Sequence, residues 1–505
     1  MKKTLILISM TVVCLIQSAV AQDNIQPFGF YLDALRFAQT QQGGSARFQA
    51  IGGAQVGLGG DLSSALSNPA GLGLYNRSEV SITPALRFMN SQSTYLDNIT
   101  DDSKTNFNIA HAGIAMYSEP ESSGGSFKGG TFAITFTKIN DFNNNYYIRG
   151  TNANTSMIDA FIGQASGATT NQFGGNDVLS LAYFNFLIGP ESILTPPGSD
   201  DVYFTDVTGI PFQEELIMTR GKQNQWSISY GANFNDKFYI GGGIGILTLD
   251  YRSVRIYSES FDVDPLNGFT LAENLAINGT GINATLGIIV RPISSLRIGA
   301  SFVSPSAYSL EDTYDATMTS NWNDYLYEDA IDGDIVLNTE YAETDILLSK
   351  YNLTTPLKLS GGAAFFFGIN GFISIDMDYI DYTHTKLSTD EFVARDDNSA
   401  IDNLANSAAI NYRIGGEYRF NTYHLRAGYA YFDTSLDSRD VFYASSQLFS
   451  AGAGMRFQNI YFDMGIVHTI SDSQYAPYFI QNAEIPVADI SADNTRVIFT
   501  VGYKY

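Results

Sequence analysis

The chain has 505 residues, of which 44% are hydrophobic, 13% are aromatic and only 16% are charged, and its formal net charge is -24. So acidic a chain disfavours nucleic acid as a partner, because nucleic acids are bound through basic surfaces. The only cysteine, Cys14, lies in a segment that we expect to be removed on export, which excludes disulfides, iron–sulfur clusters and thiolate zinc sites.

Residues 1–21 have the pattern of a secretory signal peptide. Lys2 and Lys3 precede an apolar run, and Ala19-Val20-Ala21 provides a cleavage site before Gln22. After this segment no stretch reaches the roughly 18 consecutive apolar residues that a spanning helix requires. A membrane location would therefore require a β-barrel, the other structure that satisfies every backbone group in lipid.

Residues 22–78 do not alternate like strands, and they are too apolar and too rich in glycine for a linker. We expect a short helix from Tyr31 to Gln39, a glycine-rich stretch with close turns, and a second short helix from Asp61 to Leu66 that Asn68-Pro69 ends. Such a segment needs a place to be buried. The lumen of the wide barrel predicted for the following residues is suitable, so residues 22–78 are predicted to plug it.

Residues 79–505 contain fourteen alternating apolar and polar stretches, and the spacers between them switch between short and long. This rhythm is typical of an outer-membrane barrel, which has tight turns on the periplasmic rim and longer loops outside. The predicted strands are 79–89, 105–118, 128–139, 223–235, 237–251, 279–291, 295–309, 353–367, 371–384, 407–420, 422–434, 443–457, 459–470 and 495–505. The predicted long loops are 140–222, 258–278, 310–352, 385–406 and 471–494. We therefore predict an all-β fold: a 14-stranded antiparallel transmembrane β-barrel with an N-terminal plug in its lumen.

Strand parity assigns a lipid face and a lumen face, because successive side chains point to opposite sides. The last strand places its apolar residues on one face, and its terminal aromatic resembles the signal that the outer-membrane insertion machinery recognises. The residues predicted to face lipid include Val497, Phe499, Val501, Tyr503 and Tyr505; Ile282, Ala284, Leu286, Ile288 and Val290; Tyr423, Leu425, Ala427, Tyr429 and Tyr431; and Phe449, Ala451, Ala453, Met455 and Phe457. Outer-membrane lipid and the insertion machinery are therefore expected partners.

The opposite faces carry charges of both signs. Either these charges pair with one another or with the plug, or some of the cations bind an anionic head group, for which a guanidinium fork is well shaped. The candidate ligand-binding cations are Lys358, Arg413, Arg419, Arg426 and Arg456, and they are interspersed with Glu417, His424 and Asp463.

The plug contains a set of short motifs: Gly44, Arg47, Gly52-Gly53-Ala54, Asp61 and Asn68-Pro69-Ala70-Gly71. This set resembles the N-terminal hatch of the FadL/TodX family, and the segment Ala34 to Gln39 looks most like its Bacteroidetes-type members. The resemblance implies passive outer-membrane uptake of small hydrophobic molecules such as long-chain fatty acids or aromatic hydrocarbons, gated by a hatch that includes Asn68, Pro69 and Ala70. Family hatches often carry adjacent acids, whereas here Leu62 follows Asp61.

The same Asn-Pro-Ala triplet occurs in PorV-like barrels, so a structural or secretion partner is the alternative function. Family barrels also have a kinked third strand that opens the wall sideways. Here Asn140-Asp141-Phe142-Asn143 is a poor strand sequence, which indicates either such an opening or the strand's outer end entering a loop.

No enzyme, cofactor or metal site is predicted. The histidines lie on separate predicted strands, and Asp332-Gly333-Asp334 lacks the spacing of an EF-hand loop. The glycines Gly241-Gly242-Gly243 imitate a dinucleotide loop, but they lie within an alternating strand and more readily indicate bending of a barrel.

Overall fold

The computed structural model describes residues 29–119, 125–190, 202–327, 334–405, 408–434, 445–480, 483 and 485–505. The predicted signal peptide (1–21) lies outside these residues, as do residues 22–28 of the predicted plug and Asp332-Gly333 of the acidic cluster. None of the helices in the described part of the chain combines the length and the apolar character needed to span a membrane.

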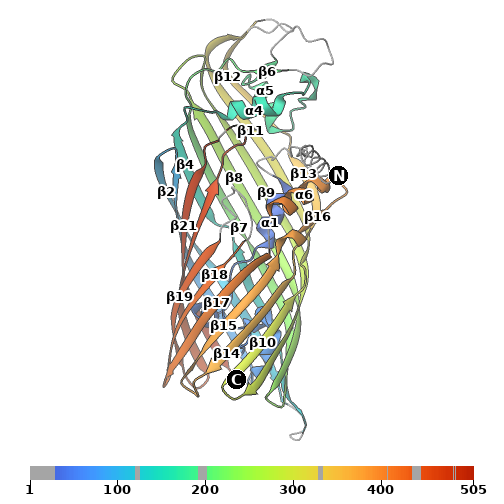
Figure 1. Cartoon of the computed structure of the whole chain (residues 1–505), viewed down its shortest axis with the longest axis vertical. Helices are drawn as coiled ribbons and strands as arrows, with labels where there is room; N and C mark the ends of the chain where they lie inside the picture. Colours follow the sequence, from blue (N-terminus) through green and yellow to red (C-terminus); the bar gives the residue numbers. More distant parts are fainter. Residues whose placement is uncertain are drawn as a thin grey trace, which may run out of the picture.

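The described residues from Glu79 onward form a closed antiparallel barrel of 14 strands, so the predicted fold class is confirmed (Figure 1). Strand β1 pairs with β2 on one side and with the last strand, β21, on the other, which closes the sheet. Some strands are interrupted, and their segments carry separate labels. The barrel segments are β1 (Glu79–Tyr95), β2 (Asn98–Ser118), β3 (Phe127–Asp141), β4 (Asn144–Thr151), β7 (Phe212–Phe234), β8 (Phe238–Ser260), β9 (Leu266–Ile293), β10 (Leu296–Val303), β11 (Ala307–Tyr327), β12 (Ile335–Glu343), β13 (Leu347–Thr354), β14 (Lys358–Phe366), β15 (Gly371–Asp381), β16 (Lys386–Ser388), β17 (Ala408–Phe420), β18 (Tyr423–Phe432), β19 (Ser446–Arg456), β20 (Ile460–Tyr475) and β21 (Ala488–Lys504).

The outer wall carries the predicted apolar band. Alternate residues of β9, such as Ile282 and Leu286, are exposed, and so are Leu425 on β18 and Val501 on β21. A closed sheet with an apolar outer face satisfies its backbone hydrogen bonds internally and is compatible with lipid. The protein is therefore an outer-membrane β-barrel.

The predicted extents of the outer loops 140–222, 258–278, 310–352 and 471–494 are wrong, because barrel strands extend into all four of them. In 258–278 and 310–352 most residues belong to strands. β8 runs to Ser260 and β9 already begins at Leu266, so the connection between them is short. In these outer portions the alternation is reversed. On β9, Phe269 and Leu271 face inward while Thr270 and Asn274 are exposed to water. The pattern of lipid-facing apolar residues therefore stops where the strands leave the membrane, although the strands continue.

An outer cap covers this end of the barrel (Figure 1). It is formed by the connection between β4 and β7 and packs on the inward apolar residues of the tall strands, among them Tyr257, Leu271, Met318 and Leu337. Its elements are α4 (Met157–Ala165), η2 (Thr170–Gln172), α5 (Val178–Phe184), β5 (Gly189–Pro190) and β6 (Tyr203–Phe204). Two further helical elements, η3 (Tyr382–His384) and α6 (Ala394–Leu404), flank β16.

The described N-terminal segment, residues 29–78, lies inside the barrel. Its elements are α1 (Phe30–Ala38), α2 (Ala46–Ala50), α3 (Ser64–Ser67) and η1 (Pro69–Leu74). Different wall strands hold successive parts of it. Ala46 N donates to Thr500 Oγ1 at 2.8 Å, Val56 N to Asp376 Oδ2 at 2.7 Å, and Ser229 Oγ to Ala65 O at 3.0 Å. The segment is thus fixed around the inner wall by hydrogen bonds from β21, β15 and β7.

Inward-facing glycines allow the backbone of this segment to approach the wall. A Cβ atom on Gly241 would lie 2.3 Å from the carbonyl carbon of Pro69, and one on Gly428 would lie 2.2 Å from Gly52 N. Real side chains do not tolerate such distances. The close approach of Pro69, rather than bending alone, explains the glycine at position 241, whereas a Cβ on Gly243 would meet the wall residue Ser229 at 2.1 Å.

We predict that Gly241→Ala destabilises the protein while Gly361→Ala does not. The added methyl group at position 241 would force Pro69 away from the wall, and overpacking of this kind costs about 1–3 kcal/mol. Gly361 lies on the outer face of β14, where a Cβ would meet nothing within 4 Å. The free energy of unfolding, measured with urea for the protein in lipid vesicles, checks this; equal losses in the two variants would contradict it.

Candidate functional site

The Asn68-Pro69-Ala70 triplet joins the N-terminal segment to the wall. Asn68 Oδ1 accepts a hydrogen bond from Ala70 N at 3.1 Å and caps η1, which begins at Pro69. Its amide nitrogen donates to Val56 O at 2.7 Å and approaches the wall carbonyls of Ile288 and Ala300 at 3.3 Å. A residue with both an acceptor and donors is needed at this position, and one amide therefore links η1, the preceding loop and the β9–β10 wall.

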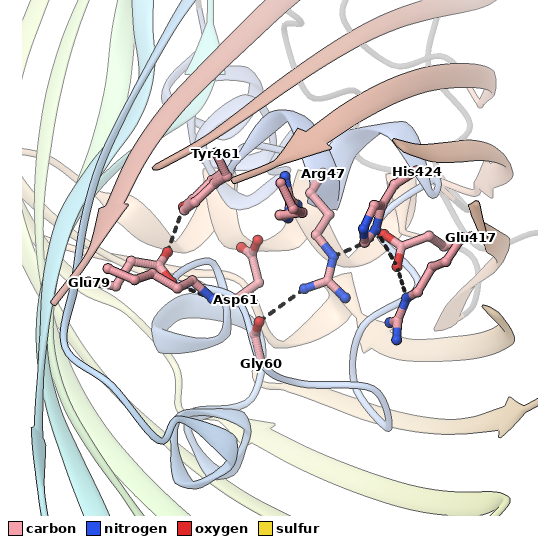
Figure 2. A pocket seen from close by; sticks show the side chains of 10 residues that line it. Arg47, Gly60, Asp61, Glu79, Glu417, His424 and Tyr461 are labelled. Atoms are coloured by element: carbon pink, nitrogen blue, oxygen red, sulfur yellow. Dashed lines mark hydrogen bonds and ion pairs between the residues drawn. The ribbon is translucent and has the colours of Figure 1, made fainter. Parts of the chain in front are cut away.

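A network of buried charges lies between this segment and the wall strands β17 to β21 (Figure 2). Arg47 Nε lies 3.4 Å from Glu417 Oε2, and its Nη1 donates to Gly60 O at 3.0 Å. On the opposite side of the site, Tyr461 donates to Glu79 at 2.6 Å. These groups line a cavity of about 140 Å³. Acidic and basic side chains both line the cavity. The cavity is therefore polar, but its charge does not make it a site for anions alone.

Asp61 belongs to the same network and to the N-terminal segment. Burial alone would raise its pKa, but the Arg47 guanidinium and hydrogen bonds from Ser63 hold the pKa of this carboxyl below its ordinary value. The Ser45 hydroxyl also donates to Asp61, with both carboxylate oxygens 2.9 Å from Ser45 Oγ. Asp61 therefore remains ionised and ties the two halves of the segment together.

The five cations proposed from the sequence face the lumen, and carboxylates contact four of them. Arg426 donates to Glu417 and to Asp463, both at 2.7 Å. Glu417 also accepts a hydrogen bond from Arg419 at 2.7 Å. Asp463 accepts hydrogen bonds from both terminal nitrogens of Arg456 at 2.9 Å. The structure thus brings Arg419, Arg426 and Arg456 together.

The remaining two cations form a neighbouring group. Arg413 donates to Asp378 at 2.5 Å. Lys358 is close enough to interact electrostatically with both of these residues. An anionic ligand at any of these arginines would have to displace a carboxylate that already occupies the guanidinium.

Above this network, helix α1 fills an apolar chamber. Its buried residues include Leu35 and Phe37, and Phe37 packs edge-on against Phe142 and Tyr251 with ring centroids 5.8 Å and 5.6 Å apart. The chamber wall is the inner face of several strands: Leu247, Leu249, Leu275, Ile277, Tyr308, Leu310, Tyr351 and Leu353. The predicted helix at residues 31–39 is confirmed, and the structure adds that it lies within an extended apolar region of the lumen.

One end of this chamber meets an interruption in the wall. Strands β2 and β3 are paired only from His111 to Ser118, and β3 stops at Asp141 before β4 continues the strand. Beyond this point side chains bridge the two strands: Asn106 donates to Asp141 at 2.9 Å and Asn108 at 3.3 Å. Ile139 and Phe142, at the interruption, both contact the chamber. The poor strand sequence at 140–143 therefore marks a break in the sheet rather than the start of the outer loop.

Some site residues were not identified from the sequence as acting together. Arg47 and Asp61 were recognised only as parts of a motif. The chamber residues of β8 and β9 were missed because they lie on the inner face of the barrel, whereas the sequence analysis looked for apolar residues on the face toward lipid. A signal was present in Leu247, Leu249 and Tyr251, which keep period two on the face opposite to the lipid-facing residues.

No family model matches the chain, and no curated protein matches it. Solved structures with the same fold do exist. A FadL homologue from Pseudomonas aeruginosa aligns with a TM-score of 0.55 and 11% identity, over 92% of this chain and 99% of that chain. The Pseudomonas putida toluene transporter TodX aligns with a TM-score of 0.51 and 10% identity, over 92% and 99%. The resemblance stated from the hatch motifs thus extends to the fold: the chain folds like these FadL/TodX-type barrels.

Proposed function

We propose that the protein is a channel for passive uptake of small hydrophobic molecules, such as long-chain fatty acids or aromatic hydrocarbons, across the outer membrane. The observation that carries this proposal is the apolar chamber around α1. A lumen whose task was only to support the wall, or to pass water and ions, would have no need for an apolar region of this size. TodX, which has the same fold, is named as a toluene transporter.

In this proposal the N-terminal segment is the gate. Helix α1 occupies the chamber and α2 to η1 occupy the lumen below it, so a ligand moves only when part of the segment shifts. The wall interruption at Asp141 provides a sideways exit into lipid, because the chamber reaches it through Ile139 and Phe142. The driving force is the ligand's own gradient, and the protein performs no catalysis.

A second function, support of a partner protein at the cell surface as in PorV-like barrels, is favoured by one observation. The lumenal arginines Arg419, Arg426 and Arg456 are satisfied by Glu417 and Asp463. A lumen filled with such pairs suits a barrel that serves as a rigid support. Binding of an anionic ligand by the five lumenal cations stays a prediction within the uptake proposal.

Mass spectrometry of the purified barrel distinguishes these two functions. Uptake predicts amphipathic or apolar small molecules in the organic extract of the purified protein. A stoichiometric protein partner without any such molecule would contradict uptake and favour the supporting role.

We predict that Phe37→Ala increases uptake of a hydrophobic fluorescent dye by cells that carry the protein in their outer membrane. Loss of a buried phenylalanine costs about 3–5 kcal/mol, and here this loss weakens the seating of α1 in the chamber. Phe365→Ala, on the lipid-facing wall at 48% exposure, is the matched control and should leave dye uptake unchanged. Unchanged or slower uptake by Phe37→Ala would contradict the gating role of α1.

We also predict that Asn68→Ala opens the lumen more often to ions. The substitution removes the cap of η1, worth about 0.5–2 kcal/mol, together with the amide contacts to the β9–β10 wall. Conductance across planar lipid bilayers measures the effect, and the expected change is more frequent and longer open events. Ser67→Ala is the control, since the Ser67 hydroxyl donates to Ser63 O within the same turn. Identical traces for both variants would show that the triplet does not hold the gate closed.

A further inference from the structure

A charged layer crosses the lumen between the outer cap and the apolar chamber. On β8, the inward residues change from Tyr251 in the chamber, through Arg255, to Tyr257 under the cap. On β9 the same sequence is Leu275, Glu273 and Leu271. Two neighbouring strands thus have an apolar inner face that ionisable groups interrupt at one height.

The layer is a connected set of buried contacts. Arg255 Nη2 lies 2.8 Å from Glu215 Oε1 and donates to the Tyr475 hydroxyl at 2.6 Å. Its other terminal nitrogen lies 3.8 Å from Glu273 Oε2. Tyr475 donates to Glu215 at 2.7 Å, and Tyr314 donates to Glu273 at 2.8 Å.

These contacts join opposite sides of the barrel. Arg255 lies on β8 and Tyr475 on β20, and these strands are not neighbours in the sheet. Glu215 and Glu273 are 1% and 2% exposed, so the layer is removed from water. A molecule that moves down the lumen from the cap to the chamber therefore has to pass between these groups.

The balance of charge in the layer is unfavourable to an anion. Among the described residues that form it, one guanidinium faces two carboxyl groups. Glu215 already pairs with the Arg255 guanidinium, so a ligand carboxylate would have to compete with Glu215 for it. It would also lose its hydration in a site that holds buried acids, which is costly when no unpaired cation compensates. The next ionisable group toward the cap, Glu259, is another buried acid and accepts from Gln213 and Met157 N, both at 2.8 Å.

We propose that the charged layer of Glu215, Arg255, Glu273, Tyr314 and Tyr475 selects uncharged hydrophobic molecules against hydrophobic carboxylates. This inference rests on the proposed uptake function and narrows its ligand class. An uncharged molecule has no net charge to place beside the carboxyl groups, and the phenols offer it flat apolar faces and hydroxyls that hydrogen-bond. Glu215 is the residue that determines the selection, since it makes the closer of the two carboxyl contacts with the Arg255 guanidinium and so keeps it from pairing with a ligand.

A matched pair of ligands tests the inference. Radiolabelled dodecanol and dodecanoate have the same chain and differ in charge at about pH 8, well above the ordinary pKa of a carboxylic acid. Uptake is measured in cells with the protein in their outer membrane, and the rate in cells without it is subtracted. We expect dodecanol to enter faster than dodecanoate, on the order of tenfold, as one unfavourable buried charge contact gives.

Glu215→Gln is the informative variant. Glutamine keeps an acceptor for Arg255 and Tyr475 but removes one of the two carboxyl groups that face the guanidinium, so the layer loses its excess of acid. Dodecanoate uptake should therefore rise several-fold while dodecanol uptake stays the same. Glu273→Gln is the second variant, and it should shift the ratio in the same direction if Glu215→Gln does not assemble. Glu311→Gln is the control, because Glu311 forms an exposed pair with Lys350 on the outer wall and should change neither rate.

The outcomes separate this inference from the function on which it rests. Preferred uptake of dodecanoate by the native protein, or an unchanged ratio in both lumenal variants, would overturn the selection and leave the uptake function in place. Uptake of neither molecule above the background of cells without the protein would overturn both. Barrel assembly of each variant is confirmed by its resistance to unfolding in cold detergent during electrophoresis.

Discussion

The backbone of the N-terminal segment lies directly against the inner wall of the barrel, and the rest of the lumen depends on this contact. It requires glycine at wall positions such as Gly241 and Gly428, where a Cβ would meet the segment at 2.3 Å and 2.2 Å. It also requires wall side chains that satisfy the backbone of the segment, as Asp376 does for Val56 and Thr500 does for Ala46. Because buried backbone groups without partners are costly, the barrel and the segment have to be compatible residue by residue.

Two networks of buried charge lie at different levels of the lumen. At the lower level, Arg47 from the segment joins Glu417 and thereby enters the network of Arg426 and Asp463. Removing one member of such a network leaves another buried charge without compensation, which is the expensive step. The upper level is the layer around Arg255. The apolar chamber with α1 lies between these two charge networks. Its lower boundary is therefore formed partly by the N-terminal segment, and its upper boundary by wall and cap residues alone.

The sequence predicts the architecture well, but it predicts poorly how far the strands extend beyond the membrane. The strand number, the lipid-facing residues of β9, β18 and β21, and helix α1 follow from patterns with a single physical cause: burial against lipid or against the lumen wall. Where β8, β9, β11 and β12 leave the membrane, water takes the place of lipid and the apolar residues move to the inner face. The residues still alternate, but the apolar ones now face the lumen and the polar ones face outward. For this reason residues 258–278 and 310–352 were expected to be loops.

The same reversal hid the upper part of the candidate site. Arg255, Glu215 and Glu273 lie in or next to stretches expected to be loops, where charged residues attract no attention. In contrast, Arg413, Glu417 and Arg426 were identified as lumenal, since their strands lie within the membrane and their neighbours face lipid. Their partners could not be derived, because pairing across the lumen joins residues far apart in the sequence, as Tyr475 and Glu215 show.

The position of α1 decides how these parts act together. The helix contacts the wall interruption at one end, through Phe37 and Phe142. At the other end it contacts the residues just before α6, where Phe30 stacks on Phe392 with ring centroids 4.0 Å apart. In the proposed uptake function, a ligand that replaced α1 would gain the same apolar surroundings, so the helix and the ligand would compete for one chamber. The energy of seating α1 would then set how tightly a ligand has to bind before the lumen opens, and a gate of this kind would need no energy source beyond the ligand itself.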